Sequence, residues 1–260
     1  MNGLLAIDIG NTNIHLGLWR DGGWTFSWRA RTVANKMPDE YASLLRNFLA
    51  GVGLTFESIK GVAISSVVPP LTLAFVELSQ RYLKIEPLVV TSQTDTGVKL
   101  EIDQTEQAGA DRIVNTAAVV ALYSTPAIVI DFGTATTFDV ISSDGAYIGG
   151  AIAPGIGVAH DALVSRAARL HKVDLVPPPS PIGKNTIHAM QSGIFWGYVA
   201  LVEGMVSRIR EAQGAMNVQV IATGGLAPLF QQHTTAIDRL APELTLEGLR
   251  VIWDRNQPQS

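Results

Sequence analysis

Two short motifs combine a carboxylate with a glycine and small polar residues. The first runs over 8–13 (DIGNTN), and the second begins at Asp131 (DFGTATT). A turn of this composition offers backbone N–H groups and short hydroxyl or amide side chains to anionic oxygens, and its carboxylate can face a hydrated cation. These are the parts needed to hold a phosphate chain and its metal ion. For either aspartate alone, a residue that merely caps its own turn is the simpler interpretation.

The spacing of the two motifs favours a shared role. Asp131 follows Asp8 by 131 − 8 = 123 positions, close to half of the 260-residue chain. Apolar runs flank both motifs, so each motif is predicted to be the turn of a β-hairpin. We therefore predict two related halves that face each other across a cleft, each contributing one carboxylate and one phosphate-facing turn.

The composition excludes several classes of protein. Apolar residues make up 47% of the chain, enough to bury large sheets, and the net charge is −4 with lysine and arginine scattered. No basic face therefore favours nucleic acid or an anionic membrane. Cysteine is absent, which excludes disulfides and thiolate sites. No apolar run approaches the ~20 residues of a membrane span. Because no leader is evident either, we expect a soluble, cytoplasmic protein.

The elements that must position the two turns are predicted to alternate between strands and helices. The first half reads as three antiparallel strands followed by alternating helices and strands, and the second half as three strands, two helices and a further strand. An α/β fold with a mixed sheet in each half follows. The predicted strands are 5–9, 14–19, 24–31, 61–68, 87–91, 127–131, 136–141, 146–152 and 218–222; the predicted helices begin at Pro38 or span 71–83, 108–123, 158–170 and 187–213.

The long helix over 187–213 carries a stripe of small residues, with Thr186 as its expected cap. The stripe consists of Gly193, Gly197, Ala200 and Gly204. Glycine costs about 1 kcal/mol in a helix, so such a stripe indicates close approach by another backbone. A neighbouring helix, the sheet or a second subunit could supply it.

Seven motifs follow one another in the order and spacing of type III pantothenate kinases, and the resemblance covers nearly the whole chain. They are DIGNTN at 8–13, SSVVPP at 65–70, GADRIVN at 109–115, IDFGTATTFDVI at 130–141, GGAIAPGI at 149–156, GKNT with QSGI at 183–194, and TGGLA at 223–227. That family belongs to the acetate and sugar kinase, Hsp70 and actin superfamily. The resemblance implies two duplicated actin-like (ribonuclease H-like) domains, over 1–118 and 119–260, with ATP in the cleft between them.

The resemblance also implies an activity and its partners. The activity is ATP-dependent phosphorylation of pantothenate to 4′-phosphopantothenate, the first step of coenzyme A biosynthesis. The implied cofactors are ATP, Mg²⁺ and a monovalent cation, K⁺ or NH₄⁺. The implied assembly is a cytoplasmic homodimer in which the partner subunit completes each substrate site.

Individual roles follow from matching positions in the family's motifs. The first phosphate loop would bind ATP together with Thr134, and Asp131 would bind the monovalent cation. The segment 109–112 would bind pantothenate, with Asp111 as the base that takes the proton from its primary hydroxyl. Thr186 would contact the substrate of the partner subunit. The implied ATP-binding residues are Asp8, Ile9, Gly10, Asn11, Thr12, Asn13, Ile14, His15 and Thr134, and the implied substrate-binding residues are Gly109, Ala110, Asp111, Arg112 and Thr186.

These roles agree with the chemistry that the residue types allow. Phosphoryl transfer needs alignment, charge neutralisation and one acceptor for the hydroxyl proton, which a carboxylate such as Asp111 provides. Arg112 could contact the pantothenate carboxylate through two parallel hydrogen bonds. From the residues alone, Asp111 is equally well interpreted as a helix-start residue that interacts with the macrodipole.

Two alternative functions remain open at this point. The family commonly has a tyrosine followed by Asp-Asn-Pro just before its GADR segment, where this chain has Ile-Asp-Gln-Thr at 102–105. Without that tyrosine hydroxyl, a kinase of another small hydroxyl substrate is one alternative. The other is a nucleotide-dependent accessory or regulatory protein related to the family. The comparison of ATP turnover with pantothenate and with sugars would separate the two kinases.

Overall fold

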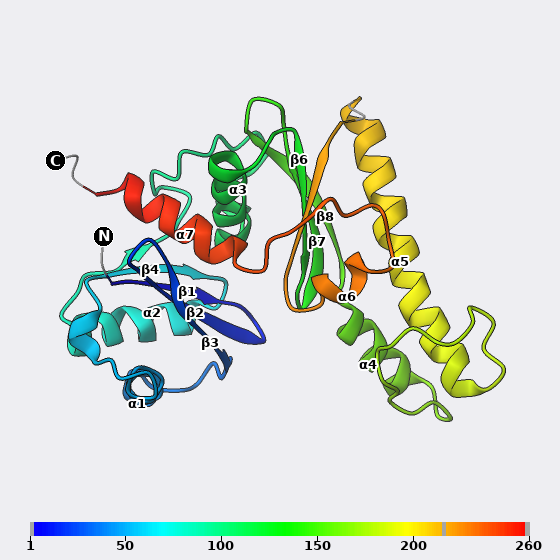
Figure 1. Ribbon diagram of the computed structural model, residues 1–260, viewed down its shortest axis with the longest axis horizontal. Helices are drawn as coiled ribbons and strands as arrows, with labels where there is room; N and C mark the ends of the chain where they lie inside the picture. The colour runs from blue at the N-terminus through cyan, green and yellow to red at the C-terminus, as the bar shows by residue number, and fades with distance from the viewer. Residues whose placement is uncertain (1–2, 215–216, 258–260) are drawn as a thin grey trace. The chain divides into compact units, whose positions relative to one another are not determined.

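The computed structural model describes residues 3–214 and 217–257 and divides into two compact units (Figure 1). Unit 1 comprises Met1–Tyr123 with Glu243–Ser260, and unit 2 comprises Ser124–Pro242. The boundary expected at 118/119 falls inside helix α3 (Ala110–Leu122), and the C-terminal helix α7 (Leu244–Arg255) lies in unit 1 instead of the second half. No helix in the described ranges has the length and apolar character needed to cross a bilayer.

The two units have the same sheet topology, as the duplicated motif predicts. Each sheet is five-stranded, with a central strand paired antiparallel to a hairpin partner on one side and parallel to a later strand on the other. Unit 1 contains β1 (Leu4–Ile9), β2 (Asn13–Arg20), β3 (Gly23–Arg31), β4 (Gly61–Ser66) and β5 (Leu88–Val89), in the order β3-β2-β1-β4-β5. Unit 2 contains β6 (Ala127–Phe132), β7 (Ala135–Ile141), β8 (Tyr147–Pro154), β9 (Gln219–Thr223) and β10 (Arg239–Leu240), in the order β10-β9-β6-β7-β8. The α/β fold with a mixed sheet in each half is confirmed.

The two aspartates occupy equivalent places in their sheets. Asp8 lies opposite His15 on β2 and Ser65 on β4. Asp131 lies opposite Thr137 on β7 and Thr223 on β9. Both aspartates therefore stand one residue before the end of the central strand, with a hairpin turn on one side and a parallel strand end on the other.

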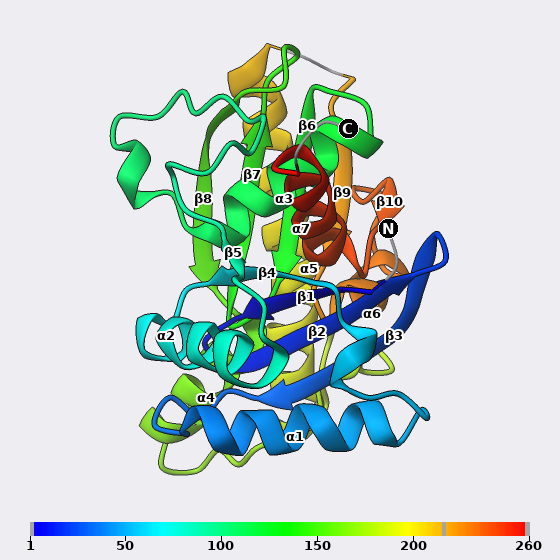
Figure 2. The same ribbon diagram turned by 90° about the vertical axis from the view of Figure 1, so that its left-hand side faces the viewer.

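Helices cover both faces of the unit 1 sheet (Figures 1 and 2). Because side chains alternate along a strand, Leu5, Ile7 and Ile9 of β1 pack on one face with α1 (Pro38–Ala50) and α2 (Pro69–Leu78). Leu4 and Ala6 pack on the other face with α3 and α7. Asp8 continues this second series, so its carboxylate lies on the side of the sheet that α3 and α7 cover.

The close crossing of α3 and α7 explains why the chain's last helix belongs to unit 1. A Cβ atom added at Gly248 of α7 would lie 2.0 Å from the Val114 carbonyl oxygen of α3, so only glycine fits at the crossing. Around it, Leu246, Leu249 and Ile252 are fully buried against β1 and β4. Packing of this kind depends on contacts more than 100 positions apart in sequence, which local patterns do not encode.

Gly248→Ala is therefore expected to destabilise the protein by about 3 kcal/mol, because the added methyl must push two helix backbones apart. The change is measured as the free energy of unfolding in urea. Gly157→Ala is the matched control, since Gly157 is also helical, in α4 (Ile156–Arg166), and an added Cβ there meets nothing within 4 Å. Alanine at that site should be neutral or stabilising by up to about 1 kcal/mol. Equal effects at the two glycines would contradict this account of the crossing.

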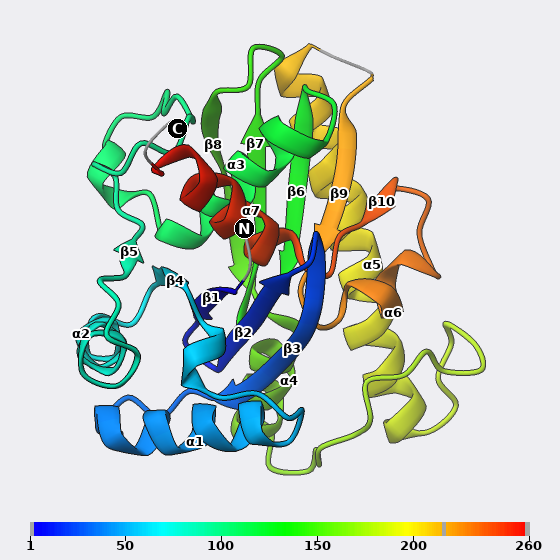
Figure 3. The same ribbon diagram turned by 60° about the vertical axis from the view of Figure 1, so that its left-hand side comes forward.

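The core of unit 2 lies between its sheet and the long helix α5 (Thr186–Gln213), which runs along β6 and β9 (Figure 3). The sequence suggested Thr186 as the cap of this helix, and that prediction is wrong. Asn185 is the cap, and its side chain accepts a hydrogen bond of 2.8 Å from the His188 backbone N–H. The short helix α6 (Ala227–Gln231) follows the Gly224-Gly225 corner.

The three glycines of the α5 stripe are open on the surface of the part of the chain that the structure describes. Cβ atoms added at Gly193, Gly197 and Gly204 would have no atom within 4 Å among the residues that the structure describes. Neither a helix nor the sheet within 3–214 and 217–257 therefore approaches these three glycines.

Candidate active site

The turn after β1 is fastened to the end of β3. The Gly10 N–H donates to the Asn13 carbonyl at 3.0 Å and closes the turn. Thr32, just beyond β3, donates from its hydroxyl to the Gly10 carbonyl at 2.6 Å and from its backbone N–H to the Thr12 carbonyl at 2.9 Å. The side chains of Asn11, Thr12 and Asn13 are exposed. The turn therefore presents its polar groups outward on a backbone that is held at both ends.

A row of polar side chains crosses the unit 1 sheet beside this turn. Its members, Ser65 on β4, Asp8 on β1, His15 on β2 and Arg29 on β3, are paired in register from strand to strand. Residues paired in this way lie on the same face. We call this set the polar row; it lies on the face that α3 and α7 cover.

Asp8 is partly buried and carries a perturbed carboxyl group. Burial and, to a smaller extent, the negative charge of Asp111 together raise its pKa from 3.8 to about 7. The Ser65 hydroxyl and the Arg29 guanidinium act in the opposite direction. A carboxylate that is short of positive charge in the free protein is suited to bind a cation, because the cation relieves the repulsion with Asp111.

His15 is neutral near pH 7. Burial, with a smaller contribution from the charge of Arg29, lowers its pKa from 6.5 to about 4. Its Nε2 lies 2.8 Å from the Ser27 hydroxyl oxygen and 3.3 Å from Oε2 of Glu243, the residue just before α7. Burial raises the pKa of Glu243, and Arg29 offsets part of this effect. His15 therefore contributes a hydrogen-bonding group and no positive charge.

Asp111, the catalytic base that the family resemblance implies, stands in the first turn of α3. Its Oδ1 accepts a hydrogen bond of 2.9 Å from the Arg112 backbone N–H, so it also serves the helix start. A Cβ atom at Gly109 would lie 2.5 Å from the same Oδ1, so the missing side chain of Gly109 makes room for the carboxylate. Since the charge of Asp111 acts on Asp8, the structure brings the predicted base and the predicted phosphate turn together in one unit.

In unit 2, the Asp131 carboxylate is enclosed by glycines. A Cβ atom at Gly224 would lie 2.6 Å from Asp131 Oδ1, and one at Gly133 would lie 3.7 Å from it. Gly224 has φ +89°, which favours glycine. The Gly155 N–H donates to the Thr134 carbonyl at 3.0 Å, which ties the second turn to the start of α4. Carboxylate and backbone oxygens in such a setting suit a hard cation.

The family model of type III pantothenate kinases matches residues 4–208. The chain belongs to the type III pantothenate kinase family. A type III pantothenate kinase from Roseiflexus sp. (strain RS-1) is 52% identical over 254 residues, which cover 98% of this chain and 99% of that protein.

Solved structures show that this pantothenate kinase has the duplicated fold of actin-like sugar kinases. A Campylobacter jejuni protein described as a Baf family transcriptional activator aligns with TM-score 0.63 and 18% identity, covering 97% of this chain and 98% of the other. An inorganic polyphosphate/ATP-glucomannokinase from Arthrobacter sp. strain KM aligns with TM-score 0.52 and 17% identity, covering 98% and 100%. At these identities the likeness shows the fold alone.

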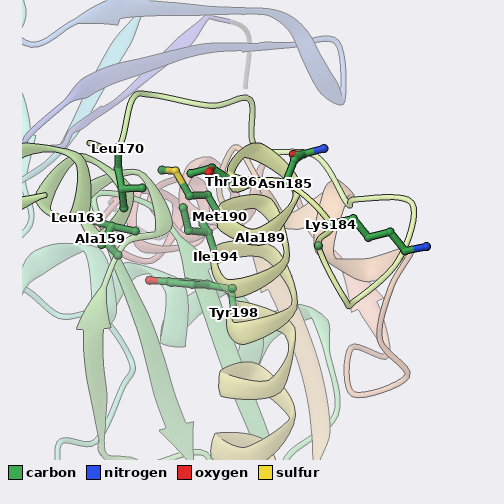
Figure 4. A pocket seen from close by; sticks show the side chains of 12 residues that line it. Ala159, Leu163, Leu170, Lys184, Asn185, Thr186, Ala189, Met190, Ile194 and Tyr198 are labelled. Atoms are coloured by element: carbon green, nitrogen blue, oxygen red, sulfur yellow. The ribbon is translucent and has the colours of Figure 1, made fainter. Parts of the chain in front are cut away.

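Thr186 lines a pocket of unit 2 that the sequence did not predict. The pocket has a volume of about 770 Å³ between α4, the segment before α5 and the first turns of α5. Figure 4 shows Leu163 and Leu170 on one side facing Met190 and Ile194 on the other, while Lys184 points away. The role of Thr186 in this kinase stays a prediction.

Several residues around the turn were missed in the sequence, although one of them lies inside a quoted motif. Ser65 opens the SSVVPP motif, and its place beside Asp8 follows only from the parallel pairing of β1 with β4. Arg29 and Thr32 reach the turn through the pairing of β2 with β3. Glu243 is 228 positions from His15, and no local pattern connects them.

No group of three or more histidine, aspartate or glutamate side chains that could hold a metal is found among residues 3–214 and 217–257. One or two carboxylates would then hold a cation together with waters, backbone or substrate oxygens. Mg²⁺ in phosphoryl-transfer sites is commonly bound in this way, through one or two carboxylates and the phosphates of the substrate. Asp8 fits that requirement.

Proposed function

We propose that this pantothenate kinase transfers the terminal phosphoryl group of ATP to the primary hydroxyl of pantothenate, with Asp111 as the general base. Phosphorylation of pantothenate in coenzyme A biosynthesis is the activity of its family. The observation that carries the proposed mechanism is the pairing of Asp111 with the Asp8 turn inside unit 1, close enough for the two charges to interact.

Each step can be assigned to a group of the chain. The Asp111 carboxylate accepts the hydroxyl proton while the hydroxyl oxygen forms a bond to the terminal phosphorus, and the bond between that phosphorus and the bridging oxygen of ADP breaks. Arg112 holds the pantothenate carboxylate through two parallel hydrogen bonds. Gly109 and Ala110 form the backbone of the same segment. Residues 8–15 and Thr134 bind ATP.

Two cations complete the proposed site. Asp8 would hold Mg²⁺, and Asp131, among the glycines that surround its carboxylate, would hold K⁺ or NH₄⁺. Bound there, such ions offset the charge of the phosphates. The raised pKa of Asp8 supports the first assignment, because it shows that the ionised carboxylate lacks the positive charge that a bound cation would supply.

We also propose a cytoplasmic homodimer in which Thr186 of one subunit contacts the substrate of the other. The open glycine stripe of α5 supports this assembly, as does the exposure of Ile187 and Ile182 near Thr186, at 57% and 78%. The absence of cysteine from the chain agrees with a reducing compartment.

The two alternative functions receive no independent support. The likeness to the Campylobacter jejuni protein and to the glucomannokinase extends to the fold and not to function at 18% and 17% identity. By contrast, identity to a type III pantothenate kinase is 52% over nearly the whole length.

The test is ATP-dependent formation of 4′-phosphopantothenate by the purified protein. Product is expected with Mg²⁺ and ATP, at a higher rate with K⁺ than with Na⁺, and glucose or mannose in place of pantothenate should give no phosphorylated product. Phosphorylation of a sugar would favour the other kinase class. Binding of ATP without phosphorylation of pantothenate would favour the regulatory class.

A further inference from the structure

Strand β3 presents two arginines on the face that carries Asp8. Arg29 is paired with His15, and Arg31 with Asn13 at the turn. The bond between His15 and the Ser27 hydroxyl shows that the odd-numbered side chains of this part of β3 point to that face. Phe26, Trp28 and Ala30 pack instead on the α1 and α2 side. Arg29 and Arg31 therefore lie beside the turn, although they belong to β3 and not to the hairpin that forms the turn.

Both arginines are exposed. Neither side chain forms a hydrogen bond or ion pair with any residue in 3–214 or 217–257. Other surface arginines of unit 1 do have acidic partners: Arg81 binds Asp39, Arg250 binds Glu247 and Arg255 binds Asp95. The charge of Arg29 nevertheless acts on Asp8, His15 and Glu243, so it lies near all three.

The phosphate turn itself supplies no positive charge. Residues 8–15 contain neither lysine nor arginine, and the one ionisable base, His15, is neutral near pH 7. Catalysis of phosphoryl transfer consists largely of positioning the phosphates and neutralising their charge, and arginine suits this because its planar fork binds two phosphate oxygens at once. Neighbouring strands lie about 5 Å apart, so Arg29 starts one strand from His15 and two from Asp8.

From this placement we infer that Arg29, with Arg31 beside it, binds the terminal phosphates of the nucleotide held by the Asp8 turn. The inference rests on the proposed function, since it assumes that residues 8–15 bind ATP. It assigns to β3 the positive charge that the turn lacks. It also makes Arg29 a ligand of ATP and leaves the pantothenate carboxylate to Arg112.

The inference is tested by equilibrium binding of ATP in the presence of Mg²⁺ and by the KM values of both substrates. Arg29→Gln should raise the Kd of ATP roughly 10- to 100-fold, as expected for loss of a hydrogen-bonded charge pair, and leave the KM of pantothenate within about twofold. Arg29→Lys should retain part of the affinity, because the charge remains without the two-pronged geometry. Arg31→Gln should have a smaller effect in the same direction.

Arg20→Gln is the matched control. Arg20 is the last residue of β2, at the opposite end of the hairpin from the turn. Its loss should therefore leave the Kd of ATP and the KM of pantothenate unchanged. An ATP Kd within twofold of the parent for Arg29→Gln would overturn the inference, as would a raised KM for pantothenate with unchanged ATP affinity. Thermal unfolding shows whether each variant is folded. If Arg29→Gln impairs folding, the ATP affinity of Arg29→Lys is used for the test instead.

The outcomes separate this inference from the proposed function. If the parent protein binds ATP but does not phosphorylate pantothenate, the proposed function fails while the ATP Kd of Arg29→Gln still decides the role of Arg29. If the parent is active and Arg29→Gln binds ATP normally, only the inference fails.

Discussion

Asp111→Asn is expected to reduce the turnover of pantothenate by roughly 10²- to 10⁴-fold, the usual contribution of a general base. The substitution keeps the size of the side chain and removes only its capacity to accept the hydroxyl proton. Affinity for ATP should not fall, because the base acts on the acceptor. A slight rise would also agree with this role, since the substitution removes a negative charge that acts on the turn proposed to hold the anionic nucleotide. The measurements are 4′-phosphopantothenate formation at saturating substrates and equilibrium binding of ATP.

The control for Asp111→Asn is Asp103→Asn, an identical change at an exposed carboxylate just before the same helix. It should leave turnover within about twofold. If Asp111→Asn instead lowered the stability of the protein and the turnover in proportion, a role of Asp111 at the helix start would be sufficient to explain the loss of activity. The amide can still accept the hydrogen bond from the Arg112 N–H, so this outcome is distinguishable from loss of the base.

The parts of the fold that the sequence predicts are those determined by near neighbours. Both hairpins were predicted because Asp8 and Asp131 are each followed by a glycine and small polar residues between apolar runs, and the turn and its strands lie within 20 positions. The equal topology of the two sheets followed from the repeat. The strand over 87–91 was predicted at its position, but only Leu88 and Val89 pair, because β5 is an edge strand with few partners.

The parts that the sequence does not predict depend on distant segments. Ser65 reaches Asp8, and Arg29 reaches His15, only through strand pairing. Helix α7 joins unit 1 because Gly248 lets it cross α3 at backbone contact. Even the local assignment of a cap to Thr186 was wrong by one residue, since Asn185 and Thr186 are both suitable cap residues and the backbone of residue 185, extended at φ −146° and ψ 167°, decides between them.

Asp8→Asn should strongly reduce activity and at the same time stabilise the free protein. Removal of the carboxylate takes away the proposed cation ligand, so turnover with Mg²⁺ and ATP should fall by roughly 100-fold or more. In the absence of nucleotide, however, the ionised Asp8 is a cost to the fold, because it is largely removed from water and close to Asp111. Asparagine has a similar shape without the charge. Turnover and the free energy of unfolding in urea measure the two effects.

The pH dependence of this stabilisation identifies its cause. The pKa of Asp8 is about 7 in the folded protein against 3.8 for the unperturbed group, so between these values the folded state binds more protons than the unfolded state. The stability of the parent therefore falls as pH rises through this window, and the loss is complete above pH 7. At 1.36 kcal/mol per pH unit, the advantage of Asp8→Asn should grow from pH 4 to pH 7, by up to about 4 kcal/mol, and stay constant above that. The exposed control Asp103→Asn should show no such growth. The stability difference between Asp8→Asn and the parent could instead stay the same at every pH. That result would mean that the surroundings do not destabilise the ionised carboxylate, and the case for Asp8 as a cation ligand would lose its physical basis.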